Sequence, residues 1–409
     1  MTKEKSTVPR LRFPGFTDAW KQRKLGEVLK ERNESRSPSA DVPLVSFTVE
    51  NGVTPKTERY NREFLVRDED KKYKFTQLDD IVYNPANLKF GAIARNKYGA
   101  AVFSPIYVTY GVLSEAHPLF VELIVTSTNF IQRALRYQEG TVYERMAVKS
   151  FDLLRSEIPL PTLPEQEAIG SFFSDLDQLI TLHQRKLDDV KELKKALLQK
   201  MFPKGNGNDF PELRFPEFTD AWKQRKLGEV AEKISQKNLD RQYVETFTNS
   251  AEFGIISQRD FFEKNISSLD NISGYYIVSP DDFVYNPRIS NLAPVGPIKR
   301  NKLGRVGVMS PLYTIFRFSD IHLDFVEKYF DTTIWHRYME LNGDSGARSD
   351  RFAIKDSVFK GLPIPLPTLP EQEAIGSFFS GLDQLITLHQ RQLDHLKLLK
   401  KALLQQMFI

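Results

Sequence analysis

Two long segments occur twice in this chain, and this internal repeat constrains the fold more than any other feature. Residues 158–202 recur at 364–408 with six differences in 45 positions. Residues 11–28 recur at 213–230 with one difference. The stretches between these constant segments share little sequence. Because a duplicated segment dictates architecture, the pattern predicts two copies of one α+β fold that carry two different surfaces.

The two variable bodies still share short motifs, which supports one fold for both. "VYNP" stands at 82–85 and at 284–287, and "RNK" stands at 95–97 and at 300–302. A solenoid is not expected, because its units have about 20–50 residues and need several copies. We interpret each "VYNP" as the end of a strand followed by a turn.

The constant tail predicts a long helix in each half. Thr162 and Glu165 have the spacing of a capping box, and Pro164 falls in the first turn, where its missing N–H costs nothing. Apolar residues then recur in steps of four and three, as in a coiled coil. The predicted seam comprises Ile169, Phe173, Leu176, Ile180, His183 and Leu187 in the first copy and Ile375, Phe379, Leu382, Ile386, His389 and Leu393 in the second.

We expect the two helices to pair with each other as an antiparallel coiled coil. The seam from residue 169 to residue 201 is ~50 Å long at 1.5 Å per residue, too long for one small domain to cover. Antiparallel pairing puts His183 and His389 near each other, and we interpret them as polar positions that set the register rather than as metal ligands. The alternative is that each helix packs separately on its own domain.

Composition excludes several classes of protein. The chain has no cysteine, which excludes disulfides and thiolate metal sites and favours a reducing, cytoplasmic setting. Neither a signal-peptide pattern nor an apolar run long enough for a membrane span occurs. The formal net charge is only +4, so any claim of nucleic-acid binding depends on local patches.

Basic residues interspersed with aromatic residues and glycines form such patches in both bodies. Arg, Lys and Asn in this setting suit contacts with phosphates and base edges, whereas a solvated surface loop is the plainer interpretation for any single residue. The candidates in the first body are Lys71, Lys72, Lys74, Lys89, Arg95, Lys97 and Tyr98. Those in the second are Arg288, Lys299, Arg300, Lys302, Arg305, Arg348 and Arg351.

The chain lacks the usual catalytic motifs. It has no Walker-type phosphate loop, no G-x-G-x-x-G fingerprint and no H-E-x-x-H. The "YNP" stretches resemble the N-P-P-aromatic motif of amino-methyltransferases only faintly, because the second proline and the aromatic are missing. We therefore expect a protein that reads a partner without chemistry of its own, and no metal site.

The layout resembles the specificity subunit of Type I restriction–modification systems over essentially the whole chain. The resemblance rests on the two constant tails, on "LPEQ" at 163–166 and 369–372, and on the "VYNP" segments. It implies two target-recognition domains, each of which reads one part of a split DNA sequence, and two helices that fix the gap between the parts. It also implies two modification subunits that methylate adenine with S-adenosylmethionine, and restriction subunits that use ATP and Mg. These cofactors are expected on the partners, and none is expected on this chain.

The resemblance also gives expected boundaries. We expect a target-recognition domain at 1–157 with its constant lead at 9–28, and a conserved helix at 158–203. A linker is expected at 204–210. A second recognition domain follows at 211–363, with its lead at 211–230, and a second helix at 364–409. Contacts with the modification subunits are expected around 160–187 and 366–393 and from the constant leads.

Two other classes of function stay open at this point. One is a stand-alone methyltransferase, against which the missing cofactor loop argues. The other is a non-catalytic two-armed scaffold that binds two proteins. Steeply salt-dependent, sequence-specific retention of DNA distinguishes the first interpretation from the scaffold.

Overall fold

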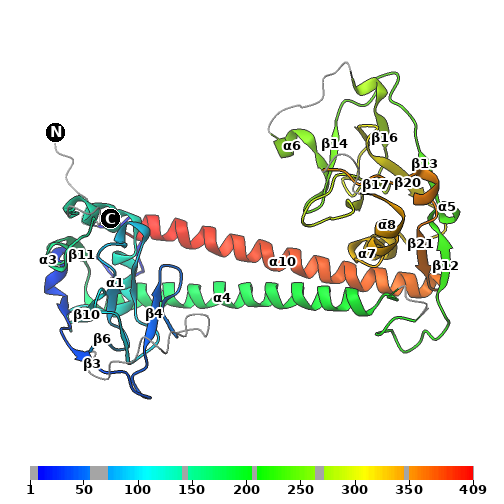
Figure 1. Ribbon diagram of the computed structural model, residues 1–409. Coiled ribbons are helices and arrows are strands. Elements are labelled where there is room, and N and C mark those ends of the chain that lie inside the picture. The colour runs from blue at the N-terminus through cyan, green and yellow to red at the C-terminus, as the bar shows by residue number, and fades with distance from the viewer. Residues whose placement is uncertain are drawn as a thin grey trace. The chain divides into compact units, whose positions relative to one another are not determined.

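The computed structural model describes residues 8–55, 72–140, 146–204, 210–262, 271–344 and 350–408. The chain divides into two compact units. Unit 1 comprises residues 1–183 and 392–409, and unit 2 comprises residues 184–391. Each unit therefore contains one variable body together with parts of both long helices, α4 (Leu163–Lys200) and α10 (Leu369–Met407) (Figure 1).

The first half consists of short strands and short helices that precede the long helix. In chain order they are β1 (Lys21–Lys24), η1 (Leu25–Glu27), β2 (Leu29–Glu31), β3 (Ser35–Arg36), β4 (Val45–Thr48), β5 (Gly52–Pro55), β6 (Tyr73–Thr76), β7 (Ile81–Tyr83), η4 (Leu88–Phe90), β8 (Ile93–Arg95), β9 (Ala101–Phe103), β10 (Val108–Val112), α1 (Pro118–Val125), α2 (Thr128–Ala134), η5 (Leu135–Tyr137), α3 (Ser150–Leu154), β11 (Glu157–Leu160) and α4 (Leu163–Lys200).

The second half repeats this order with small changes. Its elements are β12 (Lys223–Lys226), α5 (Leu227–Val230), β13 (Ala231–Ile234), β14 (Phe247–Ser250), β15 (Gly254–Ser257), α6 (Gln258–Phe262), η6 (Ile272–Gly274), β16 (Tyr276–Val278), β17 (Phe283–Tyr285), β18 (Ile298–Arg300), β19 (Gly307–Met309), β20 (Thr314–Phe318), α7 (Leu323–Asp331), α8 (His336–Asn342), α9 (Asp356–Phe359), β21 (Pro363–Leu366) and α10 (Leu369–Met407).

The four-stranded sheets of the two units have the same topology. A four-stranded sheet has the order β2-β10-β7-β8 in unit 1 and β13-β20-β17-β18 in unit 2. Neighbouring strands in both sheets are antiparallel. The register is also shared, because Tyr110 faces Ile81 in unit 1 and Phe316 faces Phe283 at the equivalent positions of unit 2. The prediction of one α+β fold in two copies is confirmed.

The constant lead and the constant tail pair with each other, which explains why both are conserved between the halves. In unit 1, β1 of the lead pairs with β11 of the tail, so that Arg23 faces Ile158. In unit 2, β12 pairs with β21, and Arg225 faces Ile364. The side chains of both "KQRK" strands are exposed. Each constant lead therefore contributes one strand of a two-stranded sheet in its own unit.

Each unit also places the two long helices in antiparallel contact. In unit 1, Met407 and Phe408 at the end of α10 pack against the core that contains Trp20, Phe120 and Phe173. In unit 2, Met201 and Phe202 after α4 pack in the equivalent way against the core with Trp222, Phe325 and Phe379. In each unit the end of one helix thus meets the beginning of the other, as the antiparallel prediction requires.

Charged pairs fix the same antiparallel register. Lys400 Nζ lies 2.5 Å from Asp177 Oδ1 in unit 1. Lys194 Nζ lies 2.5 Å from Asp383 Oδ1 in unit 2. The predicted seam residues of both helices are all buried or half-buried. His183 falls in unit 1 and His389 in unit 2, so their proximity stays a prediction.

The glutamate at the start of each long helix has a different partner from the one that a capping box would give it. Glu165 is fully buried, and both of its carboxylate oxygens accept hydrogen bonds from Arg12, at 2.6 and 2.7 Å. Glu371 accepts from Arg214 in the same way. The glutamate of "LPEQ" therefore ties the constant lead to the helix, and the helices begin at Leu163 and Leu369.

Candidate nucleic-acid interface

The predicted basic residues of unit 1 divide into paired and exposed groups. Arg95 on β8 donates to Asp79 at 2.6 Å and to Glu122 at 2.8 Å, and Lys97 also pairs with Glu122 at 2.8 Å. Lys74 on β6 donates to Asn33 at 3.2 Å. The side chains of Lys72, Lys89 and Tyr98 are exposed, and Lys71 lies outside the described residues.

In unit 2 most of the predicted cations are also held by carboxylates. Arg300 pairs with Asp281 and Asp324, both at 2.6 Å, and Lys302 pairs with Glu327 at 3.1 Å. Two further pairs are Lys299 with Asp331 and Arg305 with Glu245, at 2.8 and 2.7 Å. Arg288 and Arg351 face each other in an isolated antiparallel bridge. Arg348 lies outside the described residues.

Several of these ion pairs occur at equivalent positions in both units. Arg95 and Arg300 belong to the shared "RNK" motif, and each binds an acidic residue before the preceding strand and another on the following helix. Burial alone would lower the pKa of Arg300, but its carboxylate partners outweigh burial and raise it. A contact that occurs in both units stabilises the fold that they share. It therefore cannot explain how the two units would recognise different partners.

Another buried carboxylate binds an arginine in both units, although the arginine comes from a different position in each. Asp80 and Asp282 occupy equivalent positions and are both buried. Asp80 binds Arg32, which follows β2, at 2.8 Å, whereas Asp282 binds Arg317 on β20 at 2.7 Å. The two arginines come from adjacent strands, and Gly111 occupies the position of Arg317 in unit 1, close to Arg32. The buried charge is neutralised in both units, as burial of a carboxylate requires.

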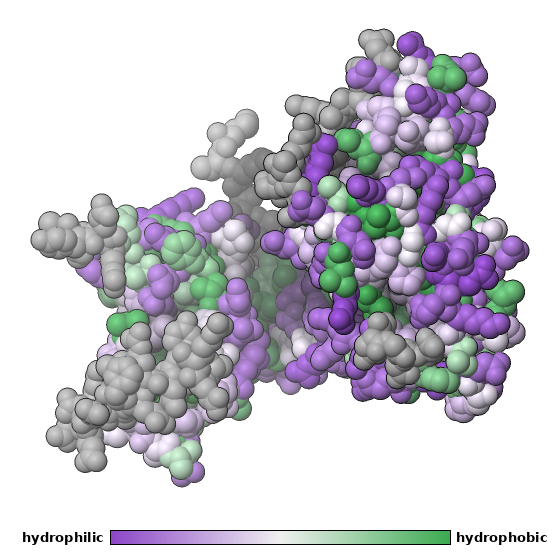
Figure 2. Space-filling view, turned by 45° about the vertical axis from the view of Figure 1, so that its right-hand side comes forward, coloured by the Kyte–Doolittle hydropathy of each residue, from purple (hydrophilic) through white to green (hydrophobic). Residues whose placement is uncertain are grey.

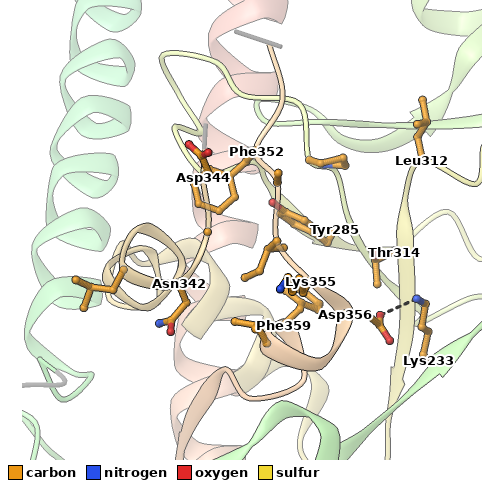
Figure 3. Close-up of a pocket in the computed structure, with 16 residues that line it drawn as sticks. Lys233, Tyr285, Leu312, Thr314, Asn342, Asp344, Phe352, Lys355, Asp356 and Phe359 are labelled. Atoms are coloured by element: carbon orange, nitrogen blue, oxygen red, sulfur yellow. Dashed lines mark hydrogen bonds and ion pairs between the residues drawn. The ribbon is translucent and has the colours of Figure 1, made fainter. Parts of the chain in front are cut away.

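Unit 2 contains a hollow of ≈ 940 Å³ between β17, β20, the end of α8 and α9. Figure 3 shows Tyr285, Phe352 and Phe359 in its wall and the ion pair between Lys233 and Asp356, at 2.6 Å, at its edge. Burial raises the pKa of Tyr285, so its phenol stays neutral. Acidic residues at this hollow offset its lysines, which makes it a poor site for a polyanion.

A neighbouring hollow of ≈ 570 Å³ in unit 2 has a different lining. It lies between the β14–β15 hairpin and the loop that follows β17, and it shares Pro287 and Leu312 with the first hollow. Its polar lining comprises Thr248, Asn249, Ser250, Gln258, Asn286, Ser290, Ser310 and Tyr313, together with Arg288, Arg351 and Glu252. Two guanidinium groups and many hydrogen-bonding groups suit contacts with a nucleic acid.

Sequence reasoning missed most of this second lining. It singled out Arg288 and Arg351 but not Asn249, Gln258, Thr248 or Tyr313. The signal was available in the repeat, because Phe47 of the first body stands where the second has Asn249, 202 residues later. A half-buried apolar position replaced by an amide is the change expected where two copies of one fold bind different partners.

Within the described ranges, no group of three or more His, Asp or Glu residues is placed to hold a metal ion. In that same part of the chain no helix combines the length and the apolar character that crossing a membrane requires. On the face seen in Figure 2, hydrophilic residues predominate, and the hydrophobic ones lie in separate patches.

Taken together, two units with one frame and unlike surfaces define a duplicated recognition protein. A family model described as the Type I restriction modification DNA specificity domain matches residues 17–192 and 219–398. The matched ranges cover most of the chain, and the chain belongs to this family.

Two curated relatives come from Methanocaldococcus jannaschii. The putative type I restriction enzyme MjaX specificity subunit is 26% identical over 286 residues, which cover 66% of this chain and 62% of that protein. The type I restriction enzyme MjaVIII specificity subunit is 24% identical over 277 residues, covering 65% and 64%. The chain therefore spans less than two thirds of the length of these relatives.

A solved structure has the same fold. The crystal structure of a Type I restriction–modification system S subunit from M. genitalium superposes with a TM-score of 0.59. The superposition covers 98% of this chain and 99% of that one, at 14% sequence identity. This likeness supports the duplicated architecture of two domains and two long helices.

Proposed function

We propose that this chain is the DNA-reading subunit of a Type I restriction–modification complex. It recognises a bipartite DNA target with a fixed gap, and it directs adenine methylation or restriction by partner subunits. The main support for the proposal is that the contacts which hold each unit together recur in both units, whereas residues at their surfaces differ. The ion pairs and sheet registers recur in both units, whereas Phe47 and Asn249 differ at one equivalent position.

The two long helices support the idea of a fixed gap. α4 has 38 residues and α10 has 39, so each is ~57 Å long at 1.5 Å per residue. One turn of duplex DNA is ~34 Å, so helices of this length match a target in which two short sequences lie about one to two turns apart. A helix also resists bending, which keeps the gap constant.

Repeated exposed apolar residues support two copies of one partner. In unit 1, Phe172, Leu179 and Leu182 of α4 are exposed. Their equivalents in unit 2, Phe378, Leu385 and Leu388 of α10, are exposed as well. The spacing of seven and three residues is that of a helical seam, and exposed apolar stripes mark interaction sites. We assign these stripes to the two modification subunits.

The chemistry belongs to those partners in this proposal. S-adenosylmethionine is expected on the modification subunits, and ATP and Mg on the restriction subunits, since this chain has none of the phosphate or dinucleotide loops that would hold them. The chain supplies recognition, and it works in the cytoplasm, where its DNA substrate is accessible. It is not itself an enzyme.

In vitro selection tests the proposal. The full chain, mixed with its modification subunits, is used to select duplexes from a random DNA library at two salt concentrations. The expected result is a motif of two short sequences separated by a constant number of unspecified base pairs, with retention that falls steeply as salt rises. Selection of a contiguous motif contradicts the fixed gap, and absence of any DNA retention favours a protein scaffold.

A further inference from the structure

The β4–β5 hairpin of unit 1 and the β14–β15 hairpin of unit 2 are equivalent elements of the shared fold. In unit 1, Val45 pairs with Pro55, and in unit 2, Phe247 pairs with Ser257 at the equivalent positions. Both hairpins turn through a glycine with a positive φ, Gly52 at 63° and Gly254 at 72°. The two hairpins can therefore be compared residue by residue.

One position inside the hairpins differs in character. Phe47 in unit 1 packs against Tyr107, with ring centroids 5.6 Å apart, and joins an apolar cluster. Asn249 stands at the same position in unit 2 and lines the hollow of ≈ 570 Å³. Tyr313 is the equivalent of Tyr107, and its hydroxyl lies 3.1 Å from Oγ1 of Thr248. The change from Phe to Asn leaves a polar hollow where unit 1 has packed rings.

The orientation of the Asn249 amide is determined by its neighbours. Nδ2 donates to the carbonyl oxygens of Val284, at 2.7 Å, and Pro297, at 3.3 Å. Because both neighbours are acceptors, the amide nitrogen must face them. Oδ1 of Asn249 and Oε1 of Gln258 are buried acceptors without a hydrogen-bond partner among the described residues. An exocyclic amino group of adenine or cytosine supplies the donor that such acceptors lack.

Two arginines stand together at the rim of the same hollow. Arg288 and Arg351 are directly opposite each other in an antiparallel bridge, and like charges in that arrangement repel. Arg288 is 3.6 Å from Asp350 and its side chain is 72% exposed. Arg351 makes no ion pair with any other residue that the structure describes. In the first body, Ala86 occupies the position of Arg288 after "VYNP", whereas Arg145 occupies the position of Arg351, so Arg288 is the arginine of this pair that unit 2 alone has.

We propose that this hollow is the base-reading surface of the second domain, with Arg351 as a direct base contact and Asn249 as the residue that opens the hollow. This inference rests on the proposed DNA-reading function and assigns one half-site to named residues. An arginine contacts the O6 and N7 acceptors of guanine through two donors. The buried amide oxygens favour a neighbouring base that carries an amino group. The hollow of ≈ 940 Å³ is not assigned this role, because its cations are offset by Asp344 and Asp356.

Selection with matched variants tests the assignment. The variants are Asn249→Phe, which installs the residue of unit 1, and Arg351→Ala, Arg351→Lys and Gln258→Ala. The full chain carrying each change is mixed with the modification subunits and selected against the same random duplex library. Arg351→Ala is expected to reduce discrimination at one base pair of one half-site by about 5- to 150-fold. Asn249→Phe is expected to change the same half-site, and Arg351→Lys to restore only part of the discrimination, since lysine lacks the bidentate fork.

The reciprocal change Phe47→Asn is the control, because it must leave that half-site as it is in the wild type. The assignment is overturned if Arg351→Ala and Gln258→Ala both leave the two half-sites unchanged, or if they alter both. A uniform loss of affinity for every sequence with Arg351→Ala identifies a phosphate contact and also overturns base reading. If the wild type selects no two-part motif, the proposed function itself fails, which is a separate result. Arg351 and Gln258 are partly exposed, so these variants give an answer even if Asn249→Phe does not fold.

Discussion

The ammonium group of Lys328 on α7 lies 2.6 Å from Oδ2 of Asp383 on α10. The Lys328 side chain is only 3% exposed and also contacts Asp331 at 3.3 Å. Burial alone would lower the pKa of Lys328, but Asp331, Glu327 and Asp383 outweigh burial and raise it. Leu123 is the equivalent residue in unit 1. An ionic contact therefore ties the body of unit 2 to its helix, whereas unit 1 has an apolar residue at the equivalent position.

Removal of the Lys328 ammonium should destabilise unit 2. The change Lys328→Ala removes one of the two lysines that bind each carboxylate and leaves Asp331 with Lys299 and Asp383 with Lys194, which is expected to cost about 1–3 kcal/mol. Urea unfolding followed by tryptophan fluorescence measures this, because Trp222 and Trp335 are both buried in unit 2. Lys149→Ala is the control, since its pair with Glu139 is exposed and worth about 1 kcal/mol or less. Equal stability of the two variants would contradict the role of Lys328.

Asp331 should make unit 2 sensitive to acid. Burial would raise its pKa, but Lys299 and Lys328 outweigh burial and lower the pKa to about 2. A carboxylate whose pKa is lower in the folded than in the unfolded state contributes stability above the unfolded value, ~3.9. That contribution is lost as the pH falls toward 2.

Unfolding free energies measured from pH 6 down to pH 2 check this. The wild type should lose stability more steeply over that interval than Asp331→Asn, which has no carboxylate to protonate. A variant with the same slope as the wild type would show that Asp331 does not carry the effect.

The pair of Arg214 with Glu371 should hold the second constant lead on α10. Arg214→Met leaves the fully buried Glu371, among the residues that the structure describes, with the indole N–H of Trp222 at 3.2 Å as its side-chain donor, and is expected to cost about 3–5 kcal/mol. Limited proteolysis of the lead and thermal unfolding measure the loss. Arg225→Met, which breaks an exposed pair with Glu229, should change neither. Comparable proteolysis of both variants would argue against the lead being held by this pair.

The exposed apolar stripes should determine how many modification subunits bind. Leu385→Glu is expected to leave a complex with one modification subunit, and Leu179→Glu combined with Leu385→Glu is expected to abolish binding. Both leucines are about 40% exposed, so the changes should alter stability by about 0.5 kcal/mol or less. Native mass spectrometry gives the stoichiometry. The control is Gln178→Glu, which lies on α4 next to Leu179. Two bound subunits in the double variant would place the interface elsewhere.

Lengthening both helices should widen the gap in the DNA target. Seven residues inserted after His183 and after His389 keep the heptad register and add ~10 Å to each helix. The gap should grow by about three base pairs, at 3.4 Å per base pair, while both half-sites keep their sequences. Selection from random DNA gives the gap directly. A gap that does not change would show that the helices do not determine the spacing.

The architecture could be predicted from the sequence because the repeat and the heptads are periodic and nearly exact. Residues such as Phe173 and Phe379 recur in one register, and burial of an apolar stripe leaves few alternatives. The role of Glu165 could not be predicted in the same way. Its partner Arg12 is 153 residues away, and local spacing favours a capping box equally well.

The candidate site was predicted less completely, for a physical reason. Cationic residues such as Arg95 and Arg300 look the same in sequence whether they face DNA or a neighbouring carboxylate. Only tertiary contacts separate the two cases. Asn249 carries no charge and belongs to no motif, so it becomes visible as a site residue only when Phe47 is recognised as its structural equivalent.

The methylome of cells that express this chain with its cognate modification subunit, measured by single-molecule sequencing, tests most directly whether the chain reads a two-part DNA target. We expect a new adenine-methylated motif in two parts separated by a constant number of unspecified bases. A contiguous motif would contradict the gap set by α4 and α10. The absence of any new motif, with the complex isolated intact from the same cells, would contradict the DNA-reading function.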